Sequence, residues 1–160
     1  MATRAPGEAA AERRRLRRAH RDIGRALGRV DALAQMAGSL ADRRLEFALQ
    51  DLLDALTAAL FPHFAWEEQE LIPGLEGPTT APSTGRLLCQ QHAQIRQALA
   101  RLEESRMALR GEPAYRQLAD LRARLYGLQA LLCAHLEQEE DVLLPTLGAA
   151  TDAGVSAGER

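Results

Sequence analysis

Residues 63–73 read HFAWEEQELIP, and residues 135–145 read HLEQEEDVLLP. Each stretch has a Glu four residues after its His and a Pro ten residues after it. Residues four apart lie on the same face of a helix. Each stretch therefore predicts a helix that projects one imidazole and one carboxylate in the same direction, and we expect the proline to end that helix.

The two stretches belong to an internal repeat, in which the first half of the chain matches the second half at a constant offset. Adding 72 to the number of His63 gives His135, and adding 72 to the number of His20 gives His92. The apolar residues between them repeat at the same offset, in the pairs Leu16 and Leu88, Ile23 and Ile95, Leu49 and Leu121, Leu53 and Leu125, Leu56 and Leu128, and Leu60 and Leu132. Such a repeat indicates two copies of one supersecondary unit, which here is a helix hairpin.

Apolar residues recur every three or four positions along four segments, which is the pattern of a helix with one buried face. The predicted helices span residues 8–36, 41–72, 83–109 and 113–144. We expect Pro62 to kink the second of them, because proline removes a backbone donor and clashes with the preceding turn.

The breaks between these segments set the topology. Short breaks at Ala37-Gly38-Ser39 and Gly111-Glu112-Pro113 form the turns within the two hairpins, and a Pro- and Gly-rich connection at 73–85 joins the hairpins across an end of the bundle. The prediction is an all-α, up-down-up-down four-helix bundle built from two pseudo-repeated helix hairpins. One domain covers 8–146, with flexible termini at 1–7 and 147–160.

All four histidines fall at one level of this bundle. His20 and His63 lie before and after the first break, at Ser39, and His92 and His135 lie at the same intervals before and after the second, at Gly111. A single histidine on an apolar face is usually a packed core residue. Four at one level are a different case, because two glutamates accompany them and buried carboxylates without partners are costly.

A metal centre resolves that cost. Four imidazoles and two carboxylates suit a pair of first-row transition-metal ions, whereas one structural zinc takes four ligands. Glu67 and Glu139 come from opposite hairpins and are placed to bridge two ions. Two ferrous ions, two glutamates and a bridging hydroxide sum to a charge of about +1, which a protein core tolerates.

The ligand set resembles the hemerythrin-like, or HHE cation-binding, family over about residues 10–146. The resemblance implies two non-heme iron ions with an oxo or hydroxo bridge, which bind O2 or a related species such as NO or peroxide. It assigns one iron to His20 and His63 and the other to His92 and His135. It also assigns the bridging role to Glu67 and Glu139.

The chain departs from the oxygen-carrying hemerythrins in two places. Those proteins have a further His one turn from the third-helix ligand, where this chain has Leu88 and Arg96. They also have an Asp five residues after the fourth-helix His, where this chain has Glu140. Sensing, buffering or carriage of a small oxidant therefore has two alternatives: a di-iron enzyme (peroxidase, NO reductase or oxidase), and iron storage or delivery.

Several residues beside the ligands have weaker signals. We expect Glu68 and Glu140 to be solvated or to support the ligands from outside, because they lie about 100° around the helix from the ligand face. We expect Cys89 and Cys133 to be small buried apolar residues, with a redox role as the lesser alternative. Three aromatic residues near His63 are expected to pack or to line an apolar gas pocket: Phe61, Phe64 and Trp66.

Composition limits the remaining function classes. The formal net charge is −2, and no apolar run reaches the roughly 18 residues that a membrane helix needs, so we expect neither a nucleic acid nor a membrane as partner. Residues 1–30 contain nine arginines, and the run from Arg13 to Arg18 among them is expected to form a solvated face, with an anionic partner as the alternative. Two cysteines and the lack of a signal sequence favour the cytoplasm. The oligomeric state stays open.

Overall fold

The computed structural model describes residues 6–39, 42–75, 82–109 and 113–155, which contain helices and turns and no strand. Its elements are α1 (Pro6–Met36), α2 (Asp42–Trp66), the π-helical η1 (Glu67–Leu71), α3 (Ile72–Leu75), α4 (Pro82–Ala108) and α5 (Tyr115–Val155). The all-α prediction is confirmed. None of the described helices combines the length and the apolarity that crossing a membrane requires.

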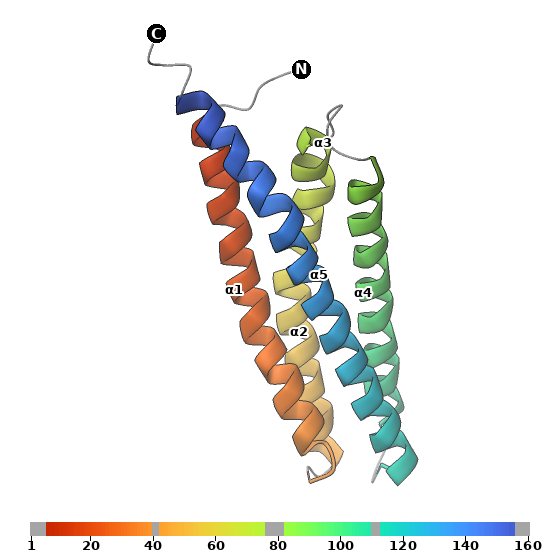
Figure 1. Cartoon of the computed structure of the whole chain (residues 1–160). Coiled ribbons are helices and arrows are strands. Elements are labelled where there is room, and N and C mark those ends of the chain that lie inside the picture. The colour runs from red at the N-terminus through yellow and green to blue at the C-terminus, as the bar shows by residue number, and fades with distance from the viewer. Residues whose placement is uncertain (1–5, 40–41, 76–81, 110–112, 156–160) are drawn as a thin grey trace.

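The four long helices form an up-down-up-down bundle (Figure 1). α1 packs against α2 and α5, and α4 packs against the same two helices. The ends of α1 and α4 lie together at one end of the bundle, and the start of α1 and the end of α5 lie at the other (Figure 1). The repeat is visible in the helix ends, since α1 ends at Met36 and α4 ends at the equivalent position of the second repeat, Ala108.

The turn after α1 is closed by hydrogen bonds to backbone carbonyls in the last turn of the helix. The backbone N–H and the hydroxyl of Ser39 each donate to the carbonyl of Met36 at 2.9 Å. From α5, Arg122 Nε donates to the carbonyl of Ala34 at 3.1 Å, so a cation satisfies the C-terminal end of the helix. A Cβ at Gly38 would lie 2.7 Å from Nη2 of Arg122, so a larger residue here would require the guanidinium to move.

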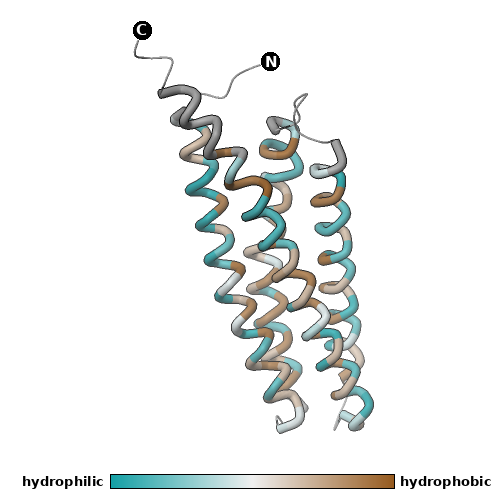
Figure 2. Tube along the Cα trace, viewed as in Figure 1, coloured by the Kyte–Doolittle hydropathy of each residue, from teal (hydrophilic) through white to brown (hydrophobic). Residues whose placement is uncertain are grey.

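Hydrophobic residues face the bundle axis in two clusters, and the hydropathy pattern alternates along every long helix (Figure 2). The turn-side cluster extends toward the hairpin ends and includes Ile23, Leu49, Leu56, Phe64, Ile95, Leu121 and Leu128. The terminus-side cluster comprises Leu16, Trp66, Leu71, Ile72, Leu88, Leu143 and Leu147. The level of the four histidines lies between these clusters.

The second helix departs from the prediction at its end. α2 is continuous through Pro62, which is exposed to solvent. The irregularity comes five residues later, where η1 is a π-helical turn in which the N–H of Ile72 bonds to the carbonyl of Glu67. π-helical turns are rare and are often found at functional sites.

The predicted end of the fourth helix at Leu144 is wrong. α5 continues through Pro145 to Val155. Its apolar face also continues, because Leu143 and Leu147 are both buried in the terminus-side cluster. Residues 147–155 thus extend the helix, while residues 1–5, 156–160 and the central part of the 73–85 connection lie outside the described residues.

The expectation for the cysteines is also wrong. Cys89 and Cys133 are both exposed and unpaired. Each directly follows a buried leucine, Leu88 or Leu132, and a step of one residue turns the side chain about 100° around the helix. That turn places both thiols on the outer surface of the bundle.

The turn-side cluster should dominate the stability of the fold. Leu56 and its repeat partner Leu128 are fully buried, so Leu56→Ala and Leu128→Ala should each lower the free energy of unfolding by about 2–5 kcal/mol. Urea denaturation followed by circular dichroism measures this loss. The control Leu87→Ala, at a side chain that is 43% exposed, should cost less than about 1 kcal/mol. Equal losses in all three variants would contradict this assignment of the core.

Candidate metal centre

The four helices bring all six predicted ligands to one place. Each of these residues is at most 8% exposed, and they are the buried polar or charged residues of the described chain: His20, His63, Glu67, His92, His135 and Glu139. α1, α2 and α4 each supply one histidine, η1 supplies Glu67, and α5 supplies both a histidine and a glutamate. The equal intervals between the histidines and the hairpin turns in the sequence therefore place the four histidines at one level of the bundle.

Glu139 lies at the centre of the group. Its Oε2 is 2.8 Å from His20 Nε2 and 3.3 Å from His63 Nε2. Its Oε1 is 2.6 Å from His135 Nε2 and 3.9 Å from His92 Nε2. One carboxylate oxygen thus faces the two histidines of the first repeat, and the other oxygen faces the two histidines of the second.

Glu67 divides its oxygens between the same two pairs. Its Oε1 is 3.6 Å from His63 Nε2, and its Oε2 is 3.1 Å from His92 Nε2. Both carboxylates therefore lie between the pair His20 and His63 and the pair His92 and His135. A tighter subset spans both pairs, because donor atoms of His63, Glu67, His135 and Glu139 lie within 4.8 Å of one another.

The buried donor atoms are close together but poorly hydrogen-bonded to one another. Both nitrogens of His63, both oxygens of Glu67, Nε2 of His92 and of His135 and Oε1 of Glu139 lack a hydrogen bond in the described residues. Leaving such atoms unsatisfied in a core costs about 1–3 kcal/mol each. Nitrogen and carboxylate donors that converge with few hydrogen bonds among them are the set that a divalent transition-metal ion requires, so the residues fit a metal centre.

The pKa values of the buried histidines and glutamates also indicate a site where the carboxylates need positive charge. Burial by itself lowers the pKa of His92, but the nearby carboxylates of Glu139, Glu67 and Glu68 outweigh it and raise the pKa to about 9. Burial raises the pKa of Glu139, but the four imidazoles around it outweigh burial and hold the pKa well below its usual range. The pKa of Glu67 is raised, chiefly by burial and further by the charge of Glu139. Without metal, imidazolium protons therefore supply the positive charge that the carboxylates need.

Glu68 and Glu140 contact the ligands from outside. Glu68 Oε1 accepts a hydrogen bond from Nδ1 of His92 at 2.7 Å and one from Arg96 Nη1 at 3.0 Å. Glu140 Oε1 accepts one from Nδ1 of His20 at 3.1 Å. The support is crossed, since each repeat supplies the glutamate that orients a histidine of the other repeat. Such partners fix the orientation and the tautomer of a metal-binding imidazole.

His135 has a different partner, which the sequence did not indicate. Gln91 Oε1 accepts from Nδ1 of His135 at 3.1 Å, and Gln91 Nε2 donates to Gln138 Oε1 at 2.6 Å. A glutamine next to a ligand has no distinctive pattern, and only its position one residue before His92 could have suggested a role. Nδ1 of His63 has no such partner in the described residues.

The aromatic residues near the site divide into two groups. Phe64 stacks on the His92 ring at 4.0 Å between centroids and meets the edge of His135 at 5.4 Å. Trp66 is buried in the terminus-side cluster, 6.4 Å from the His63 ring centroid. Phe61 is 43% exposed and belongs to neither group. The packing role is thus correct for Phe64 and Trp66 and wrong for Phe61.

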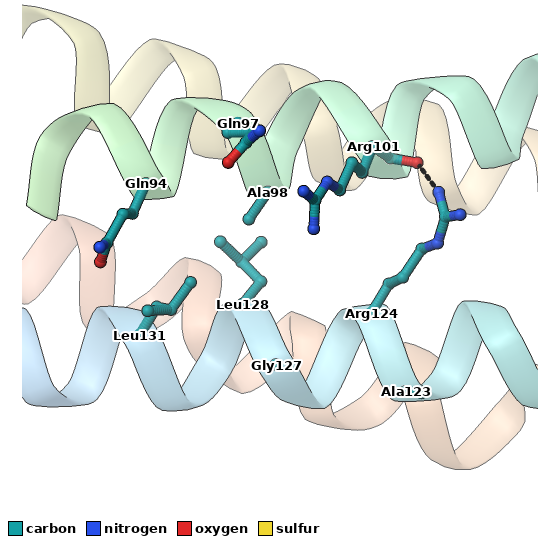
Figure 3. A pocket seen from close by; sticks show the side chains of 9 residues that line it. All are labelled: Gln94, Gln97, Ala98, Arg101, Ala123, Arg124, Gly127, Leu128 and Leu131. Atoms are coloured by element: carbon teal, nitrogen blue, oxygen red, sulfur yellow. Dashed lines mark hydrogen bonds between the residues drawn. The ribbon is translucent and has the colours of Figure 1, made fainter.

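A cavity of about 540 Å³ between α4 and α5 lies apart from the six ligands (Figure 3). Its walls are glutamine, arginine and small apolar side chains, and Arg124 Nη1 donates across it to the carbonyl of Arg101 at 2.6 Å. The residues that line it include no histidine, carboxylate or cysteine, so this cavity offers no typical metal ligand.

Comparison with known proteins gives one match. The family model described as the hemerythrin HHE cation binding domain matches residues 11–147. No curated protein and no solved structure matches the chain.

Metal affinity should increase with pH. A metal binds the neutral imidazole, and His92 with its pKa of about 9 must first lose a proton at pH 7. The apparent affinity should therefore rise by up to about tenfold per pH unit and level off near pH 9. Competition with a chelator at several pH values measures this rise. An affinity that stays constant between pH 7 and 9 would contradict it.

The stability of the metal-free protein should change in the opposite direction over the same range. The pKa of His92 is raised above its ordinary value of 6.5, so the stabilisation that it contributes is complete below pH 6.5 and is lost as the pH rises through about 9. Thermal unfolding of the metal-free protein should show a falling midpoint between these pH values. The metal-loaded protein, whose imidazoles have already lost their protons, should not show it.

Removal of a supporting glutamate should weaken metal binding. Glu68→Ala and Glu140→Ala should each reduce the affinity by about 10- to 100-fold, because the imidazole that each orients becomes free to rotate. The matched control is Glu137→Ala, an exposed glutamate on α5. If the control weakens binding as much as the other two variants do, the effect comes from surface charge rather than from orientation.

Proposed function

Because the chain belongs to the hemerythrin HHE cation-binding domain family, we propose that its six buried ligands hold two iron ions and that this centre binds O2 or a related small oxidant, NO or peroxide, for sensing, buffering or carriage. Cation binding is the property of the family. The identity of the metal, the number of ions and the small ligand are parts of the proposal.

The observation that carries the proposal is the division of the carboxylate oxygens. Glu67 and Glu139 each direct one oxygen to the His20 and His63 pair and the other to the His92 and His135 pair. A single ion would leave at least one histidine pair with a buried nitrogen and no partner. Two ions, one for each pair, give every Nε2 and every carboxylate oxygen a ligand role.

When bound, non-heme iron supplies the electrons and the open coordination positions that chemistry with small oxidants needs. The protein residues hold and shield the ions. The terminus-side and turn-side clusters cover the histidine level from both directions along the bundle, so they exclude bulk water. Phe64, stacked on His92, fixes that ring from the turn side.

The additional histidine of the oxygen carriers has no counterpart in the described structure. Leu88 is fully buried in the terminus-side cluster, and Arg96 is held by Glu68. α4 therefore offers one ligand, His92. Fewer protein ligands leave more positions for exogenous molecules, and this observation favours the second candidate, a di-iron peroxidase, NO reductase or oxidase.

Metal analysis of variants tests the centre. The protein reconstituted anaerobically with ferrous iron should bind two ions per chain. His63→Ala or Glu139→Ala should abolish that stoichiometry, because each side chain contacts other members of the ligand set. Gln50→Ala, at a partly exposed α2 residue outside the centre, is the control. Two ions in either ligand variant would contradict the assignment.

Turnover separates the two candidate functions. For a binding protein, O2 added to the reduced, iron-loaded protein should change the optical spectrum, and removal of O2 should restore it. For an enzyme, peroxide or NO should be consumed over many cycles per centre. Catalytic consumption would overturn the binding function, and reversible binding without consumption would overturn the enzyme.

A further inference from the structure

The two repeats differ on the outer side of one histidine. Nδ1 of His135 is covered by Gln91, which is itself held by Gln138. The equivalent residues of the first repeat are Ala19 and Trp66. Alanine cannot reach His63, and the indole of Trp66 turns into the terminus-side cluster. The first repeat therefore lacks the amide that the second repeat supplies.

A groove occupies the space that this amide would fill. It has a volume of about 240 Å³, lies between α1 and α2, and is lined by Arg15, Arg18, Ala19, Asp22, Ala58, Ala59, Pro62, His63 and Trp66. Its wall is mainly apolar, with three alanines, a proline and an indole. The volume is sufficient for a small organic molecule and exceeds what one water needs.

His63 lines this groove, and the outer edge of its ring carries a buried and unsatisfied nitrogen. Its side chain is 1% exposed, and its Nε2 lies on the side of Glu67 and Glu139. Nδ1 is on the opposite edge of the ring and has no hydrogen-bond partner in the described residues. A metal-binding histidine almost always donates its other N–H to an acceptor, so the groove should hold an acceptor for this group.

The charges at the groove favour an anion as that acceptor. Asp22 is paired with Arg25, and Arg15 lies over the Trp66 ring and 3.6 Å from Glu70. Arg18 has no ion pair with a described acid, so one positive charge at the mouth is uncompensated. A carboxylate accepts hydrogen bonds from both an imidazole N–H and a guanidinium.

We propose that the groove between α1 and α2 binds a small monocarboxylate with a short apolar tail, whose oxygens accept from Nδ1 of His63 and from Arg18 while its tail packs against the alanines and Trp66. The site is separate from the metal positions, because it uses the outer edge of the ring. It rests on the proposed function in one respect, since a metal at Nε2 keeps the proton on Nδ1.

Isothermal titration calorimetry with propionate tests the site on the full chain, both loaded with ferrous iron under anaerobic conditions and metal-free. We expect one propionate per iron-loaded chain. Ala19→Gln, which introduces the residue found at position 91, should weaken binding at least about tenfold, because the new amide fills the groove and bonds to His63. Arg18→Gln should weaken it by a similar factor.

The controls use the same substitutions outside the groove. Ala11→Gln and Arg17→Gln change exposed residues of α1 and should leave propionate affinity unchanged. Propionamide, which has the tail without the charge, and nitrate, which has the charge without the tail, should both bind more weakly than propionate.

Three results would overturn the proposal. The first is that propionate does not bind at millimolar concentration, and the second is that Ala19→Gln binds propionate as tightly as the unchanged chain does. The third is that propionate binding requires iron and is unchanged in both groove variants, because propionate would then be a metal ligand. Iron stoichiometry measured on the same samples keeps the two ideas distinct. Propionate binding without two irons would leave the groove site standing and contradict the di-iron centre.

Discussion

Two carboxylates buried among four imidazoles are the constraint on which this bundle depends. Glu67 and Glu139 have no exposed surface, and they lie close enough for the charge of one to raise the pKa of the other. Such a pair is stable only where positive charge surrounds it. Helices from both repeats must therefore meet at the level of the four histidines. The hydrophobic clusters on either side exclude bulk water from that level. Packing and electrostatics thus specify the same register.

Much of this arrangement could be predicted because the sequence repeats itself. Alignment of the two halves matches His20 with His92 and His63 with His135, and equal intervals to the two turns place all four at one height. The fold and the composition of the site follow from these intervals. The crossed support by Glu68 and Glu140 was only half predictable, since periodicity gives the angle of a residue around its own helix but not the neighbour that it meets.

The features that were missed depend on tertiary contacts. Proline ends a helix when its neighbours gain nothing from continuing, but Leu147 is buried beyond Pro145, and α5 therefore continues. Cys89 and Cys133 are near the ligands in sequence but on the outer face in space. Gln91 acts only because Gln138 holds it across the α4–α5 interface. The repeat also suggested two equivalent halves, whereas Arg96 and Gln91 in the second half correspond to Gly24 and Ala19 in the first.

The π-helical turn gives the two central glutamates different backbone geometries. Glu139 lies within the continuous helix α5, whereas Glu67 begins η1. No insertion explains the difference, because the repeat keeps its register on both sides of the turn, at His63 and at Pro73. A π-helical turn closes its hydrogen bond over five residues instead of four, and such turns are frequent at functional sites. A regular helix thus presents Glu139, whereas a local irregularity presents Glu67, so the two carboxylates reach the space between the histidine pairs from backbones of different geometry.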